Sequence, residues 1–210
     1  MKDSIVITNI LGSFATNCYT VANQETRDAV IIDPAARADF LIDLIKKEKF
    51  NLKAVLLTHG HIDHIGALAG LREAYPELVV YACEDEKEVL ESSVYNLSSM
   101  FGHATEEKAD IYLEDGQEIE LIGKKIKCIH VPGHTKGGMC YYFEEDKKLF
   151  SGDTLFAFSI GRSDFPTGDA DALIDNIEKK LFTLPEEVIV YPGHNDRTTI
   201  KREKNGNPYF

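Results

Sequence analysis

The sequence predicts an α+β fold in which two sheets pack face to face and helices cover their outer surfaces. Short runs of β-branched and aromatic residues fall into two groups, with helical periodicity between and after them. Histidines and aspartates stand where several of these runs end. No linker or low-complexity stretch divides the 210 residues, so we expect a single domain over residues 1–210.

The first group of strands precedes a helix. Asn-rich or Gly-rich turns separate its members, which we expect over 4–10, 18–22 and 29–33. Pro34 ends the third strand. A helix is expected over 39–49, with Phe40, Leu44 and Ile45 directed inward.

A buried strand is expected over 54–57, where four apolar residues follow one another. Ile65, Leu68 and Leu71 recur at helical spacing and predict a helix soon after it. Another strand is expected over 78–82.

Residues 84–110 differ in character from the strands around them. The segment is charged and helical at first and polar later, so we expect a helical insertion over the core and a candidate lid. A surface excursion without that role is an equal alternative. His103, within the segment, is expected to be solvated.

The second group of strands surrounds an amphipathic helix. The strands are expected over 117–121, 125–131, 139–143, 148–150 and 188–191. The helix is expected over 170–182, acidic at its start and basic at its end. Its apolar stripe consists of Leu173, Ile174, Ile177 and Leu181. A short helix over 198–204 follows the last strand.

Composition and charge disfavour several classes of function. The net charge of −12 disfavours nonspecific binding to nucleic acid or anionic membrane, which needs a basic surface. No run of about 18 apolar residues is present, and the first residues alternate like a strand rather than a signal peptide. The four cysteines form no C-x-x-C pair and have apolar flanks, which predicts buried, reduced thiols of a cytoplasmic protein.

Four candidate metal ligands follow the strand over 54–57: His59, His61, Asp63 and His64. Residues two apart on an extended segment point to the same side, so His59 and His61 can meet one ion. Asp63 and His64 point elsewhere, as ligands of a second ion would. Imidazole and carboxylate without thiolate suit zinc, iron or manganese. The alternative is a polar loop in which Asp63 caps a helix, which leaves three histidines without a role.

Three further candidates stand at strand ends. The repeated pattern Pro-Gly-His stops two strands and leaves His134 and His194 at a sheet rim. Asp153 follows the strand over 148–150, beside a glycine, where a carboxylate could bridge two cations. Each one alone suits an ordinary turn residue. Together with the first cluster, five histidines and two aspartates converge on strand ends.

This ordered set resembles the metallo-β-lactamase superfamily over essentially the whole chain. The matching motifs are the strand ending in Asp33, the H-x-H-x-D-H run 59–64, Gly133-His134-Thr135, Gly152-Asp153 and Gly193-His194. The resemblance implies a four-layer αβ/βα sandwich with two mixed sheets, outer helices and the site at one edge. One implied ion takes His59, His61 and His134. The other takes Asp63, His64 and His194, and Asp153 lies between the two.

Finer resemblance points to the glyoxalase II-like hydrolases, the hydroxyacylglutathione hydrolase-like branch. The matching segments are Gly161–Phe165, Gly168-Asp169 and Asn207–Tyr209. Because the chain stops soon after His194, we expect a short, single-domain member without the helical domain that helps to bind glutathione.

The implied activity is hydrolysis of a small acyl thioester by a hydroxide that bridges two divalent ions, Zn²⁺ before Fe or Mn. Asp63 would be the catalytic residue that orients the hydroxide and relays its proton. We expect a small-molecule substrate and neither nucleic acid nor membrane as a partner.

Other side chains are expected to support the site. Asp33, Thr58 and Thr135 are candidates to accept the second N–H of the imidazoles, although ordinary turn roles suit the threonines slightly better.

Four residues are candidates for substrate binding. Lys136 and Arg162 could hold a substrate carboxylate, unless Arg162 pairs with Asp164. Tyr95 and Asn17 could line the pocket.

Three other functions use the same residues. They are a mononuclear iron persulfide dioxygenase, a lactone or β-lactam hydrolase, and a metal-binding module without catalysis. Retention of all seven ligands speaks modestly against the dioxygenase.

Overall fold

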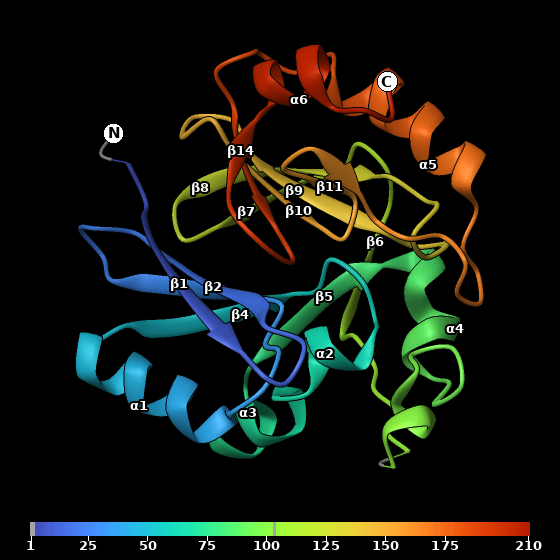
Figure 1. The fold of residues 1–210 in the computed structure, drawn as a ribbon. Helices are drawn as coiled ribbons and strands as arrows, with labels where there is room; N and C mark the ends of the chain where they lie inside the picture. Colours follow the sequence, from blue (N-terminus) through green and yellow to red (C-terminus); the bar gives the residue numbers. More distant parts are fainter. Residues whose placement is uncertain (1–2, 103) are drawn as a thin grey trace.

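The computed structural model describes residues 3–102 and 104–210, so His103 and the first two residues lie outside the description. Two six-stranded sheets stack face to face, and helices lie on their outer sides (Figure 1). The predicted α+β sandwich of four layers is confirmed.

The first sheet contains six strands in chain order. They are β1 (Ile5–Leu11), β2 (Thr16–Ala22), β3 (Asp28–Ile32), β4 (Asn51–Leu56), β5 (Val79–Cys83) and β6 (Ile111–Leu113). β1 to β3 pair antiparallel and β3 to β6 pair parallel. Parallel neighbours need crossover connections, which here include α1 (Ala38–Glu48), α2 (Ile62–Ile65) and α3 (Leu68–Ala74).

The second sheet has the strand order β14-β13-β10-β9-β8-β7. Its strands are β7 (Glu118–Leu121), β8 (Lys124–His130), β9 (Met139–Phe143), β10 (Lys148–Gly152), β13 (Ile189–Pro192) and β14 (Thr198–Thr199). On its outer side lie α5 (Ala170–Asn176), which continues as a π-helical turn, and α6 (Ile200–Gly206) (Figure 1). A small hairpin, β11 (Leu155–Phe156) with β12 (Ser159–Ile160), leaves the end of β10.

The segment 84–110 contains short helices, as expected, and leads into a strand that was not predicted. A 3-10 turn (Glu84–Glu86), α4 (Lys87–Leu90) and a second 3-10 turn (Ser98–Phe101) follow β5. The chain then returns as β6, which pairs parallel with β5 at the sheet edge. β6 has only three residues, too few for a periodic pattern to reveal a strand.

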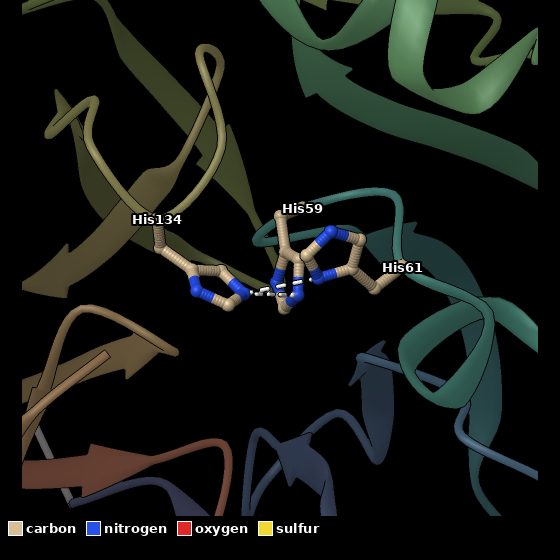
Figure 2. A group of neighbouring side chains, drawn as sticks. All are labelled: His59, His61 and His134. Carbon is tan, nitrogen blue, oxygen red and sulfur yellow. Dashed lines mark hydrogen bonds between the residues drawn. The ribbon is translucent and has the colours of Figure 1, made fainter. Parts of the chain in front are cut away.

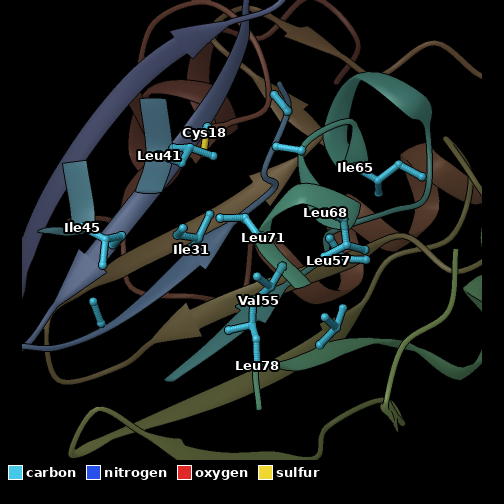
Figure 3. Packing of buried hydrophobic residues seen from close by; sticks show 14 of the residues in the cluster. Cys18, Ile31, Leu41, Ile45, Val55, Leu57, Ile65, Leu68, Leu71 and Leu78 are labelled. Carbon is cyan, nitrogen blue, oxygen red and sulfur yellow. The ribbon is translucent and has the colours of Figure 1, made fainter. Parts of the chain in front are cut away.

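Buried apolar side chains form three layers, one at each junction of the sandwich. One layer lies between α1, α3 and the first sheet (Figure 3). A second lies between the sheets, and a third lies between the second sheet and α5. Leu173, Ile177 and Leu181 are fully buried in the third layer, which confirms the predicted stripe at these positions.

Helix α1 buries Ile45, as predicted, but directs Leu41 rather than Phe40 toward the sheet. Leu41 and Ile45 are buried one turn apart, whereas Phe40 is 37% exposed. Adjacent residues lie about 100° apart around a helix, so directing Leu41 to the sheet turns Phe40 away from it.

Two sequence expectations concern the chain as a whole. All four cysteines, Cys18, Cys83, Cys128 and Cys140, are free and buried. Within residues 3–102 and 104–210, no helix is long and apolar enough to cross a membrane.

Two hydrogen bonds join the sheets beside the histidine cluster. The Tyr141 hydroxyl in β9 donates to the Leu57 carbonyl at 2.8 Å, and both side chains are fully buried. The Met139 N–H donates to the Thr58 carbonyl, also at 2.8 Å. Burial raises the pKa of Tyr141 well above its ordinary value, so the hydroxyl stays a neutral donor. The two sheets are therefore fastened where the predicted ligand loop begins.

Replacing Tyr141 with phenylalanine should lower the free energy of unfolding by about 1–3 kcal/mol, because the Leu57 carbonyl loses its buried donor. Urea unfolding measures the change. Tyr209→Phe is the control, since Tyr209 is 50% exposed and its loss should change stability by less than ~0.5 kcal/mol. Equal stability of the two variants would contradict the assigned role of Tyr141.

Candidate metal centre

The seven predicted ligands converge at one edge of the sandwich, where strands of both sheets end. They are His59, His61, Asp63 and His64 after β4, His134 after β8, Asp153 after β10, and His194 after β13. β10 and β13 run parallel, so their carboxyl ends meet at this edge.

Three histidines form one group (Figure 2). His134 Nε2 lies 3.0 Å from His61 Nδ1 and 3.3 Å from His59 Nε2. The three residues are buried, and their ring planes stand 84–86° apart. Ligands bound tetrahedrally to zinc at about 2.0–2.1 Å lie roughly 3.3 Å from one another. The three nitrogens therefore have the spacing of ligands to one shared ion.

The other ligand candidates form a second group joined to the first by Asp153. Asp63 Oδ2 lies 3.4 Å from His64 Nε2 and 3.3 Å from His194 Nε2. Asp153 Oδ1 lies 3.4 Å from His64 Nε2. Its Oδ2 lies 3.6 Å from His134 Nε2 and 3.5 Å from His194 Nε2. One carboxylate thus faces both groups.

Unpartnered buried atoms test whether these residues fit metal ions. Among the candidate ligands, three atoms are buried without a hydrogen-bond partner: His61 Nε2, His64 Nε2 and Asp153 Oδ1. Each such atom costs about 1–3 kcal/mol unless something else binds it. Two of the three point into the second group. Five imidazoles and two carboxylates also suit divalent transition metals, so the residues fit two such ions.

Asp33 fixes the orientation of the first ligand loop. Its carboxylate accepts hydrogen bonds from the Thr58 N–H at 2.8 Å and the Thr58 hydroxyl at 2.6 Å, and lies 2.9 Å from His64 Nδ1. Thr58 Oγ1 lies 3.2 Å from His59 Nδ1. Asp33 has φ 51°, a strained conformation held by these contacts. The contacts suit the orienting roles predicted for Asp33 and Thr58, because they leave Nε2 of each imidazole free to ligate.

His134 is oriented by a backbone group instead of the predicted threonine. Its Nδ1 lies 2.6 Å from the Arg162 carbonyl oxygen, which accepts its hydrogen bond. Thr135 has a different contact from the predicted one, since its hydroxyl donates to the Glu86 carboxylate at 2.8 Å. The prediction used only the sequence neighbourhood of His134, and the true acceptor is distant in sequence.

Sequence reasoning missed the buried carboxylate of Glu86. Glu86 Oε1 accepts the Gly60 N–H at 2.7 Å, and Oε2 accepts the Gly137 N–H at 2.9 Å in addition to the Thr135 hydroxyl. Burial raises the pKa of Glu86 to about 7, opposed by these three hydrogen bonds. Gly60 lies between two ligand histidines, so Glu86 couples that loop to the loop of His134. The neighbouring residues Glu84 and Asp85 are acidic and exposed, so no feature of the local sequence showed that Glu86 is buried.

The repeated Pro-Gly-His pattern has a steric reason. A Cβ on Gly193 would lie 2.2 Å from Asp153 Oδ1 and 2.7 Å from His64 Cε1. A Cβ on Gly133, at φ 137°, would lie 2.4 Å from the Leu173 Cβ. Only glycine lets one strand end close around the ligands and lets the other pack against α5.

Electrostatics divide the histidines into two kinds. Burial, followed by the charge of neighbouring imidazoles, lowers the pKa of His59 well below its ordinary value and that of His61 to about 3. Burial acts in the same direction on His64 and His194, but nearby carboxylates outweigh it. They raise the pKa of His64 to about 9 and that of His194 to about 10.

A cavity of about 440 Å³ opens onto the cluster. Five candidate ligands line it, together with apolar side chains and Arg162. The Arg162 guanidinium forms two hydrogen bonds of 2.7 Å with the Asp164 carboxylate, which is the alternative predicted for this arginine.

The other predicted substrate-binding residues lie outside the lining of this cavity. Lys136 and Tyr95 border a separate hollow of about 700 Å³. Asn17 is buried and donates to the backbone carbonyls of Pro192 at 3.0 Å and Asn195 at 2.9 Å. Asn17 therefore supports the chain on both sides of the last ligand histidine rather than facing a substrate.

Two mixed sheets with outer helices and a histidine–aspartate cluster at their common edge define an αβ/βα sandwich whose edge could hold metal. The model of the metallo-beta-lactamase superfamily matches residues 11–194. The chain belongs to the metallo-β-lactamase superfamily and has its fold, and it is a metallo-hydrolase of that superfamily.

Similar proteins carry different names. Hydroxyacylglutathione hydrolase GloC of Haemophilus influenzae is 36% identical over 204 residues, which are 94% of each chain. The BLEG-1 B3 metallo-β-lactamase has a TM-score of 0.92 at 38% identity, over 98% of this chain and 99% of that one. TTHA1623, solved in a di-iron-bound form, has a TM-score of 0.86 at 35% identity, over 97% and 100%.

Replacing Glu86 with alanine should weaken metal binding about 10- to 100-fold, because the two loops that carry His59, His61 and His134 lose their common acceptor. Competition with a chromophoric chelator measures the affinity. Glu84→Ala is the matched control, since Glu84 is an exposed acid two residues away. Unchanged affinity in Glu86→Ala would remove Glu86 from the account.

Metal loading at pH 7 should release about two protons per chain from the ligand imidazoles, and about one more if a bound water is deprotonated to hydroxide. His64 and His194 have pKa values of about 9 and 10, so both are protonated before loading, and ligation requires neutral imidazole. His59 and His61 are already neutral because their pKa values are lowered. Calorimetry in two buffers of different ionisation enthalpy counts the protons. A count near zero would show that His64 and His194 release no protons when metal is loaded, which would contradict their assigned protonation.

Proposed function

We propose that the protein is a binuclear metal-dependent hydrolase of small acyl thioesters, similar to glyoxalase II. The observation that carries this proposal is the Asp153 carboxylate, whose oxygens lie 3.4–3.6 Å from nitrogens of both ligand groups. A shared ligand suits a pair of ions, for which we propose Zn²⁺, with iron or manganese as alternatives. The name of the relative GloC supports the thioester class.

The chain's own residues would bind the ions and move a proton. Two divalent ions held there would supply a hydroxide nucleophile at neutral pH and polarise the substrate carbonyl. Asp63 lines the cavity, and its Oδ2 accepts a hydrogen bond from the Thr16 hydroxyl at 2.8 Å. Burial raises the pKa of Asp63, but His64, His194 and Thr16 together lower it by more. The net effect is a lowered pKa, so the carboxylate is ionised. The ionised Asp63 carboxylate would accept a hydrogen bond from the hydroxide and so orient it, and it could relay the hydroxide's remaining proton to the departing sulfur.

The substrate we propose is a free small molecule, and neither nucleic acid nor a membrane surface. The net charge of −12 supports this choice. We also propose a cytoplasmic location, supported by the four free, buried cysteines.

Hydrolysis of a β-lactam or lactone is the second candidate. The observation that favours it is the likeness to BLEG-1 over nearly the whole of both chains. The same nucleophile would then attack an amide or ester carbonyl.

A hydrolysis panel on protein of known metal content tests the proposal. We expect kcat/KM for thioesters to exceed that for lactones and a β-lactam by at least ~100-fold. S-lactoyl-glutathione and a thioester of a smaller thiol should agree within about 100-fold, because Arg162, the arginine among the described residues that line the cavity, already pairs with Asp164.

Asp63→Ala should lower thioester hydrolysis by at least ~100-fold, the scale of a positioned acid or base. Near wild-type turnover of this variant with full metal occupancy would remove Asp63 from the mechanism. A β-lactam cleaved faster than every thioester would replace the first candidate by the second. If iron-loaded protein consumed oxygen in the presence of a persulfide, persulfide oxidation would replace both hydrolase candidates.

A further inference from the structure

The cavity above the metal centre has an apolar wall that hydrolysis itself does not need. Seven of the described residues that line it are apolar, and they come from separate parts of the chain. Phe14 lies in the β1–β2 turn, Ile62 begins α2, Phe101 belongs to the segment 84–110, and Phe156 lies in β11. A wall assembled from four segments around a reactive centre is a place where part of a substrate can be recognised.

Phe14 and Phe101 form an edge-to-face pair in this wall. Their ring centroids are 4.9 Å apart with an interplanar angle of 76°. The two residues are 46% and 49% exposed, so the pair presents adjoining apolar surface to the cavity. A second hollow of about 280 Å³ shares Phe14, Ile62, Asp63 and Phe101 with the cavity. A substrate arm that passes these rings therefore has room beyond them.

The backbone holds Phe101 near the site. The Ile62 N–H donates to the Asn96 carbonyl at 2.8 Å, which ties the segment 84–110 to the start of α2. Asn96 is itself buried, and its side chain donates to the Thr105 carbonyl at 2.7 Å. The apolar wall is thus positioned in advance, which lowers the entropic cost of binding an apolar group.

The same walls disfavour an anionic arm. Among the described residues that line the cavity, Arg162 is the cationic side chain outside the ligand set, and it is bound to Asp164. It also lies 3.9 Å over the Phe165 ring, which directs its charge to neighbours within the chain. Among the described residues that line the second hollow, there is neither a lysine nor an arginine. A substrate carboxylate placed there would meet no cationic side chain among them.

We propose that the site selects substrates whose arm beyond the reacting carbonyl is an uncharged alkyl or aryl group, packed against Phe14, Phe101 and Ile62. This inference rests on the proposed thioester hydrolysis, in which water adds to the acyl carbon and the carbon–sulfur bond breaks to give an acid and a thiol. The apolar arm can belong to the acyl group or to the thiol, and the test separates the two.

Two substrate series test the proposal. In the first series the acyl group lengthens from acetyl to octanoyl and the thiol is always N-acetylcysteamine. In the second series the acyl group is always acetyl and the thiol lengthens from ethanethiol to octanethiol. A fully buried methylene contributes up to about fourfold. Because the rings are only half covered, we expect kcat/KM to rise by at least ~10-fold in one series. In the double variant Phe14→Ala/Phe101→Ala the rise should fall below ~3-fold.

Phe40→Ala is the matched control, since Phe40 is 37% exposed on α1, outside both hollows. It should keep the wild-type dependence on chain length. A flat dependence in both series of the wild type, or an unchanged rise in the double variant, overturns the inference.

Binding of non-hydrolysable thioethers separates this inference from the proposed function. S-octyl-N-acetylcysteamine should bind metal-loaded protein at least ~10-fold more tightly than the S-ethyl compound, and the double variant should lose the difference. If no thioester is cleaved but this preference is found, the hydrolase proposal fails and the apolar site stands. Equal affinities for the two thioethers overturn the apolar site whether or not thioesters are cleaved.

Discussion

Seven candidate ligand side chains converge at one edge of the protein, and much of the structure is arranged to hold them there. Unpartnered buried lone pairs are costly, so each ligand needs a second contact that fixes its direction. Asp33 supplies it for His64, and the Arg162 carbonyl supplies it for His134. The sandwich brings strand ends of both sheets to one edge, and the Tyr141 hydroxyl fastens the sheets at the start of the ligand loop.

The segment 84–110 contacts both the candidate ligand cluster and the apolar wall of the cavity above it. Near its start, Glu86 accepts hydrogen bonds from both loops that carry the three-histidine group. Further along, Leu97 and Phe101 line the cavity above the ligands. One insertion between β5 and β6 therefore contacts the loops of the candidate metal ligands and also lines the cavity above them. This dual role explains why a polar, irregular segment contains several buried residues, including Asn96 and Ser98.

Much of the fold and of the ligand cluster could be predicted because the signals are local. His59 and His61 are two residues apart after an apolar strand, and Pro-Gly marks the two strand ends before His134 and His194. Contacts between residues far apart in the sequence could not be predicted from such local patterns. The burial of Glu86 and the role of the Arg162 carbonyl depend on segments distant in sequence.

The lack of non-local information also explains why the predicted substrate-binding residues differ from those that line the cavity. Thr135, Lys136, Tyr95 and Asn17 were chosen for their type and approximate position, and the structure places their side chains on other partners or around another hollow. The ligand roles themselves stay predictions until metal is measured. A crystal structure of metal-loaded protein, with anomalous scattering to locate each ion, tests the central claim most directly. We predict two ions, both bound by the Asp153 carboxylate at about 2 Å. A single ion, or Asp153 more than about 4 Å from both ions, would contradict it.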